Sequence, residues 1–278
     1  MSESAGLIGS LQDRWAGGHA RDPRWNGYLP TFHDNLFQKL HALSEDEFRR
    51  GDGSELTDTP KRPAKMRALV SSSALAVNFF DAWRDADKVA LSEALGTPPI
   101  AGLEFEFKTK NYPVRPRSPN LDLLLRLQDG QLIAVESKFS EPYRSDDGHG
   151  ALSARYFASS QTLWRDSHLD GAQELASRLQ PEWIHLDAPQ LLKHLLGLAN
   201  DPSKPACLLY LWFDTSKPDT LVHRREIADF SKAVASDSIA FQSRTYQDVF
   251  DRVPSGSSPV DGWHAYMRER YFPATPAV

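Results

Sequence analysis

The hydrophobic pattern of this chain changes its period near residue 100, and this change constrains the fold more than any other feature of the sequence. Before it, Leu75, Phe79 and Trp83 recur every four residues. This spacing predicts an amphipathic helix over residues 71–84, with the serines at 71–73 as capping candidates. After it, apolar and charged residues alternate, which is typical of a strand. The chain is therefore expected to combine helices with a sheet.

Three strands are expected to form an antiparallel meander. They cover residues 103–107, 121–127 and 132–139. Asp129-Gly130 separates the last two, and this dipeptide is a strong signal for a tight hairpin. A fourth apolar run, residues 206–213, has the composition of a central strand that is buried on both faces.

Helical spacing and turn residues predict the remaining elements. The expected helices cover residues 32–43, 152–164, a segment that starts at Asp187, and residues 225–234, 245–252 and 261–271, with a short strand at 239–241. This order favours an α/β fold in which a mixed sheet is flanked by helices.

The composition is that of an ordinary soluble globular protein. Of the 278 residues, 40% are hydrophobic and 25% are charged, and no run is long enough to span a membrane. The acidic start lacks the basic region of a secretory signal, so we expect a cytoplasmic protein. The net charge of −5 disfavours a cationic coat protein, but a local basic surface can still bind DNA.

Three charged residues interrupt apolar strands and are the main candidates for chemistry. Asp122 lies in a leucine-rich strand, and Glu136 and Lys138 share a face of the next one. The hairpin would bring them together, with the two carboxylates roughly 4 to 6 Å apart, as in a site for a hard divalent cation. A solvent-facing strand pair with an ordinary salt bridge has the same spacing, so the residues alone leave both interpretations open.

Short runs over most of the chain carry a family resemblance. Pro119-Asn120-Leu121-Asp122 followed by Val135-Glu136-Ser137-Lys138 resembles the PD-(D/E)XK nuclease superfamily, whose fold is that of type II restriction endonucleases. Residues 72–80, 136–143 and 245–247 resemble uncharacterised bacterial restriction-endonuclease-like proteins. One departure is that no acidic residue stands out on the preceding helix, and the resemblance implies that Asn78 takes a related position there.

The resemblance implies an αβββαβ core at about residues 71–213. Residues 1–65 would form an N-terminal helical extension, and residues 66–278 would form the nuclease-like domain with a C-terminal α/β extension, all in one compact unit. The implied activity is Mg²⁺-dependent endonuclease cleavage of DNA in restriction, with Mn²⁺ as the alternative metal. The alternatives are a repair or recombination nuclease on the same fold, and a catalytically silent module that binds DNA or a partner.

The resemblance also implies roles for particular residues. Asp122 and Glu136 would hold the metal together with the backbone carbonyl of Ser137, and Lys138 would orient or help deprotonate the attacking water. Glu104 and Glu106 are expected on one face of the neighbouring strand, where one of them could add a third carboxylate. Glu106 is preferred because it lies nearer the loop. Supporting roles fall to Asn78 and Gln161.

Basic residues near this site fit a polyanionic partner. The candidates for contacts with DNA phosphates are Lys108, Lys110, Arg115 and Arg117, with a second group at Lys61, Arg62, Lys65 and Arg67. A solvated loop is the alternative for each group. A homodimer would suit a symmetric DNA site.

Overall fold

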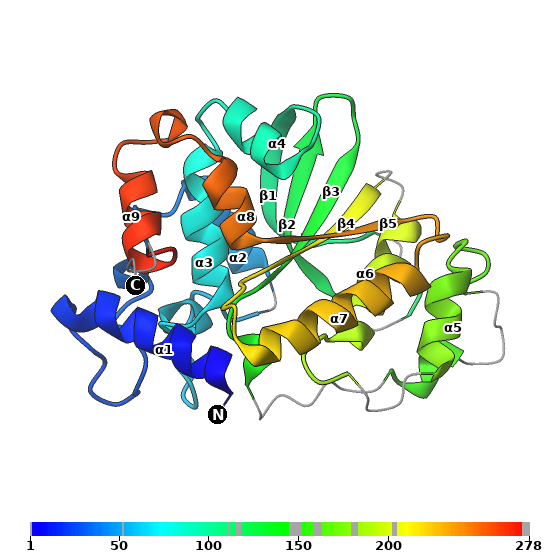
Figure 1. The fold of residues 1–278 in the computed structure, drawn as a ribbon, viewed down its shortest axis with the longest axis horizontal. Helices are drawn as coiled ribbons and strands as arrows, with labels where there is room; N and C mark the ends of the chain where they lie inside the picture. Colours follow the sequence, from blue (N-terminus) through cyan, green and yellow to red (C-terminus); the bar gives the residue numbers. More distant parts are fainter. Residues whose placement is uncertain are drawn as a thin grey trace.

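A mixed five-stranded sheet forms the centre of the molecule (Figure 1). The computed structural model describes residues 2–51, 53–110, 112–114, 118–144, 152–157, 163–178, 183–201 and 205–273. The strands lie side by side in chain order, as β1 (Ile100–Lys108), β2 (Asn120–Leu127), β3 (Leu132–Lys138), β4 (Pro205–Trp212) and β5 (Ala240–Thr245). Pairing is antiparallel from β1 to β3 and parallel from β3 to β5.

The hairpin between β2 and β3 forms as predicted. Gly130 adopts a φ of +85°, which glycine tolerates without steric cost, and the N–H of Leu127 donates to the carbonyl of Gln131 at 2.9 Å. The resulting register pairs Leu123 with Val135. The meander is therefore confirmed, and its register positions the candidate site.

Helices whose buried side chains form one core cover one face of the sheet, at the left and top of Figure 1. They include α3 (Ser72–Phe80), α4 (Val89–Leu95), α8 (Tyr246–Arg252) and, outside α3, α9 (Trp263–Arg270). Ser71 caps α3 as predicted, since its Oγ accepts from the N–H of Ala74 at 3.1 Å. Residues 74–80 of α3 are all buried, because the helix lies between the sheet and α9. Phe79 meets Trp263 edge to face at 5.7 Å between ring centroids.

The opposite face packs against α5 (Asp170–Arg178), α6 (Ala188–Ala199) and α7 (Pro218–Ala233), at the lower right of Figure 1. Asp187 caps α6, since its Oδ1 accepts from the N–H of Gln190 at 2.9 Å. Five leucines of α6 are almost fully buried, and each contributes about 1.5–3 kcal/mol by leaving water. They are Leu191, Leu192, Leu195, Leu196 and Leu198.

The N-terminal segment packs against the first of these two cores. Ile8 of α1 (Glu3–Trp15) and Phe48 of α2 (Ala42–Arg50) belong to the same buried cluster as α3. The backbone N–H of Ser4 also donates to Asp219 of α7 at 3.1 Å. The proposed boundary at residue 65 stays a prediction.

The helix predicted at residues 32–43 is wrong. This segment contains a 3-10 turn, His33–Asn35, before α2 begins. The N–H of Phe37 donates to Asn78 Oδ1 at 2.6 Å, and the N–H of His41 donates to Asp81 Oδ2 at 2.9 Å. Because the side chains of Asn78 and Asp81 accept these backbone hydrogen bonds, the segment does not need helical hydrogen bonds, and it buries its apolar residues without forming a helix.

Other expectations were met in part. The order αβββαβ and the α/β class with a mixed, helix-flanked sheet are confirmed. Helix α5 was not predicted, and at the start of residues 152–164 the structure has a 3-10 helix, Ala154–Phe157. In the described part of the chain, no helix combines the length and the apolar character needed to cross a membrane.

Candidate active site

The ladder between β2 and β3 ends just before two carboxylates. Leu123 pairs with Val135, and the next pair in this register is Asp122 with Glu136. At that point Asp122 Oδ2 accepts a hydrogen bond from the backbone N–H of Ser137 at 2.7 Å. A side-chain carboxylate thus replaces a backbone partner, while β3 continues its pairing with β4 through Lys138.

Lys138 and Glu136 form a buried ion pair. Nζ of Lys138 lies 2.7 Å from Glu136 Oε1 and donates also to Oε1 of Gln190 on α6, at 2.8 Å. The Glu136 side chain is 1% exposed and that of Lys138 is 15% exposed. Charges at this depth are tolerated because they are paired and hydrogen-bonded, and removal of one partner would leave the other uncompensated.

The second oxygen of Glu136 faces a histidine that the sequence analysis did not single out. Nε2 of His194 on α6 lies 3.0 Å from Glu136 Oε2, and its side chain has no exposed surface. Burial alone would raise the pKa of Glu136, but the positive charge of Lys138 and the contact with His194 outweigh it and lower the pKa to about 2. Glu136 is therefore an anion at neutral pH.

The pKa of Asp122 is shifted in the opposite direction from that of Glu136. Burial, and then the negative charge of Glu136, hold the pKa of Asp122 well above its usual range, against the lowering effect of Lys138. The two carboxylates repel each other, and a divalent cation bound between them would relieve this repulsion.

Glu106 lies next to this pair but has its own partners. Its φ of +52° is rare for a residue with a side chain, and its Oε2 accepts from Asn120 Nδ2 at 2.7 Å. Gly51, at the end of α2, comes so close that a Cβ there would lie 2.7 Å from Glu106 Oε2. Burial, and next the charge of Glu55, raise the pKa of Glu106 to about 7.

Glu104 lies in a different environment. Its carboxylate pairs with Arg126 across the strands at 2.6 Å, and both side chains reach solvent. The regular alternation of β1 ends at Glu106, because Phe105 packs in the first core and Phe107 in the second. Of the two glutamates, Glu106 is thus the one whose charge acts on Asp122.

Glu55 is a further buried carboxylate that the sequence analysis missed. It is 6% exposed, accepts from Lys65 Nζ at 2.9 Å and from Ser73 Oγ at 2.5 Å, and repels Glu106. It comes from a glycine-rich loop before α3, where no periodic pattern distinguishes a buried glutamate from a solvated one.

The raised pKa of Glu106 gives a testable stability effect. A carboxyl whose pKa rises on folding binds more protons in the native state, so it destabilises the fold as the pH rises from about 4.5 to 7. Glu106→Gln should therefore raise the free energy of unfolding at pH 8 by roughly 1–2 kcal/mol, and much less at pH 4. Urea unfolding at both pH values measures this. Glu104→Gln is the control, and an equal gain there would contradict the assignment.

The oxygen atoms available at this site fit one hard cation that keeps some of its water ligands. In the described part of the chain, no three His, Cys, Asp or Glu side chains form a group that could hold a metal ion. Mg²⁺ commonly binds proteins through one or two carboxylates and keeps several waters, so Asp122, Glu136 and a backbone oxygen suffice for it. Glu106 as a third ligand stays a prediction.

The remaining predicted residues have varied placements. Asn78 is 3% exposed, and its amide bonds with Phe37, Asn35 and Tyr271, so it joins the N- and C-terminal segments to α3 rather than reaching the carboxylates. Lys110 is exposed beyond β1, and Lys108 is partly buried. Gln161, Arg115 and Arg117 lie outside the described residues.

The second basic group, residues 61–67, also contains both exposed and buried side chains. Arg67 is 4% exposed and forms ion pairs with Asp22 and Asp58, which corrects its interpretation as a DNA contact. Lys61 and Arg62 are exposed, and Lys65 pairs with Glu55.

A residue of the 245–247 run reaches the candidate site. Tyr246, the first residue of α8, shares a hydrogen bond of 2.7 Å between its hydroxyl and Ser137 Oγ. Gln247 binds both the N–H and the carbonyl of Asp214, just beyond β4. The first contact braces the end of β3, from the face opposite α6, and the second braces the chain beyond β4.

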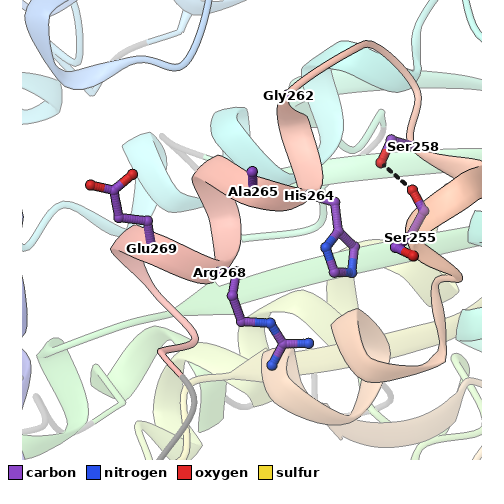
Figure 2. A pocket seen from close by; sticks show the side chains of 7 residues that line it. All are labelled: Ser255, Ser258, Gly262, His264, Ala265, Arg268 and Glu269. Carbon is purple, nitrogen blue, oxygen red and sulfur yellow. Dashed lines mark hydrogen bonds between the residues drawn. The ribbon is translucent and has the colours of Figure 1, made fainter.

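A shallow pocket of about 580 Å³ lies elsewhere, on the outer side of α9 (Figure 2). His264 and Arg268 project from α9 on the same side, and both pack on the ring of Phe250, at 4.6 and 4.8 Å from its centroid. None of the clustered carboxylates lines this pocket. We therefore place the candidate active site at the ends of β2 and β3.

Comparison with known proteins identifies a family. A family model described as "Restriction Endonuclease associating with ARP" matches residues 13–272, a range that includes all five strands. No curated protein and no solved structure matches the chain. The resemblance to restriction-endonuclease-like proteins and the corresponding fold are thereby confirmed.

Proposed function

The chain belongs to the family of restriction endonucleases associating with ARP, and on this basis we propose that it is a Mg²⁺-dependent endonuclease that hydrolyses DNA phosphodiester bonds. One observation carries the proposal. Asp122, Glu136 and Lys138 meet at the point where β2 and β3 separate. This arrangement supplies two anions for a cation and one cation for a phosphate.

Asp122 and Glu136 would hold the metal, with the carbonyl of Ser137 as a third oxygen. A bound divalent cation supplies an acidified water and stabilises negative charge on the phosphoryl group. The protein itself contributes the fixed orientation of the carboxylate oxygens that would bind the metal. Ser137 N–H fixes one oxygen of Asp122, Lys138 fixes one oxygen of Glu136, and His194 Nε2 lies 3.0 Å from the other.

Lys138 would act as a fixed cation. Burial alone would lower the pKa of Lys138, but the negative charges of Glu136 and Asp122 outweigh it, so the pKa lies above its usual value. A lysine that keeps its proton at neutral pH is a poor base for water. It is well suited to orient a water molecule and to offset charge on the phosphate.

DNA would approach this edge of the sheet through exposed basic residues. Lys110 projects near the end of β1, and Lys61 and Arg62 are exposed in the loop before α3. We propose phosphate contacts for them and for Lys108, Arg115 and Arg117. Replacing any one of these residues with alanine should reduce the dependence of log affinity on log salt by about one unit.

We further propose a role in restriction, with a homodimer that cuts both strands. A two-fold dimer would present two such sites to the two strands of a symmetric sequence. The family description supports this role over repair.

Purified protein should convert supercoiled plasmid to nicked and linear DNA when Mg²⁺ or Mn²⁺ is present, and not with EDTA. The assay uses a panel of unmethylated plasmids and genomic DNAs of different base composition, so that many candidate recognition sequences are presented. Ca²⁺, which fits oxygen ligands but supports hydrolysis poorly in many Mg²⁺ sites, serves as the control for binding. Tight DNA binding without cleavage under every condition would identify a silent binding module instead.

A further inference from the structure

His194 is a polar residue within the leucine-rich run of α6. It follows Leu191 and Leu192 and precedes Leu195 and Leu196, all of which are buried in the second core. His194 itself is 1% exposed. A leucine would fill such a position without the cost of burying two ring nitrogens, which is on the order of 1–3 kcal/mol for each unsatisfied group. The histidine therefore needs a reason other than packing.

Its position relative to the site supplies that reason. Residues four apart lie on the same face of a helix, so Gln190 and His194 project side by side from α6. Gln190 Oε1 is 2.8 Å from Lys138 Nζ, and His194 Nε2 is 3.0 Å from Glu136 Oε2. One helix face thus contacts both members of the buried ion pair.

Nε2 of His194 lies 3.0 Å from Glu136 Oε2. Among the described residues neither ring nitrogen has a partner in hydrogen-bond geometry, and neither does that carboxylate oxygen, so the contact is a close approach of two buried polar groups. A hydrogen on Nε2 would lie on the side of the ring that faces the Glu136 carboxylate, which can only accept. We assign this tautomer from the contact.

We propose that His194 is a positioning residue that orients the Glu136 carboxylate for a divalent cation and so raises the affinity of the site for the metal. The inference rests on the proposed function, because it assigns a metal to Glu136. Without His194, Glu136 would be held by Lys138 at one oxygen alone and could rotate. Partners that orient a metal-binding carboxylate typically contribute 10- to 100-fold in affinity.

The test is direct binding of Mn²⁺ to the full chain, measured by calorimetry without DNA. His194→Leu removes the donor and fits the leucine-rich surroundings, and it should weaken Mn²⁺ binding by about 10-fold or more. His194→Met gives the same test with a more adaptable side chain in case the leucine variant folds poorly. His194→Gln retains an N–H donor and should restore an affinity close to that of the parent.

Leu195→Ala is the matched control. Leu195 is the neighbour of His194 on α6 and is equally buried, so the change should lower the melting temperature, since large-to-small core changes cost about 2–5 kcal/mol, but it should not change Mn²⁺ affinity. Equal weakening by Leu195→Ala would mean that His194 acts through general stability, and it would overturn the proposal.

The outcomes separate this inference from the proposed function. If His194→Leu and His194→Met bind Mn²⁺ like the parent, the positioning role is wrong, even if the parent cleaves DNA. If they bind it weakly while the parent binds Mn²⁺ but cleaves nothing, the positioning role holds and the nuclease proposal fails. A parent that does not bind Mn²⁺ at all would overturn the positioning role.

Discussion

Replacing Lys138 with methionine should abolish DNA cleavage while DNA binding largely survives. Nζ of Lys138 is held between Glu136 and Gln190, where it can act on a water molecule and a phosphate but does not hold the metal. Loss of a fixed donor to the transition state typically costs 10²- to 10³-fold in rate. Cleavage measured on gels and affinity measured by filter binding, on the same preparations, test the two halves of this prediction.

The same substitution leaves a buried carboxylate with one partner fewer, so stability must be measured alongside. Removal of one member of a buried pair costs about 3–5 kcal/mol. Lys65→Met is the matched control, because Lys65 also pairs with a buried glutamate, at 2.9 Å from Glu55, but is 47% exposed. If folded Lys138→Met cuts DNA as fast as the parent, the mechanism proposed here is wrong even though the fold is right.

Asp122→Asn should also stop cleavage, but by weakening the metal site rather than by removing the phosphate partner. Asparagine keeps an acceptor for the N–H of Ser137 and loses the charge that a cation requires. We expect a loss of about 100-fold in cleavage at low Mg²⁺, since even indirect ligand partners contribute 10- to 100-fold. Mn²⁺ binding should weaken in parallel.

Asp122→Asn should raise the free energy of unfolding at neutral and higher pH, although it lowers activity. The pKa of Asp122 is raised on folding, so its native state binds more protons, and it destabilises the fold increasingly as the pH rises through that pKa. Asp122→Asn has no such penalty and should unfold at higher urea concentration at pH 8, with little difference at pH 4.

Asp129→Asn is the control for both effects. Asp129 lies in the same hairpin and also accepts a backbone N–H, from Gln131 at 2.9 Å, but it is exposed. It should retain both cleavage and parental stability. An Asp122→Asn protein that cleaves normally, or that loses stability at pH 8, would contradict the assigned role.

The elements that the sequence predicted correctly have local causes. The alternation in residues 103–107, the Asp129-Gly130 turn and the apolar run at 206–213 act over a few residues, and the hairpin sets its own register. Asp122, Glu136 and Lys138 could be placed together for that reason, because a tight turn fixes which residues of its two strands are opposed.

The errors have tertiary causes. Residues 32–43 have helical spacing, but Asn78 and Asp81 of the α3 segment take their backbone donors. Arg67 belongs to a basic group in the sequence and is neutralised by Asp22 and Asp58 in the structure. Partners that are distant in the chain overrode local preference in both cases.

The sequence by itself determined the αβββαβ order, the hairpin register and the three charged residues at its open end. Tertiary structure alone decided which further residues surround them, namely His194 and Gln190 from α6, and Glu55, whose charge acts on Glu106. The physical reason is that the hydrogen bonds and side-chain alternation that define a strand or a turn involve residues close together in the chain. The pKa of a buried carboxylate instead depends on charges that only packing brings within a few ångströms.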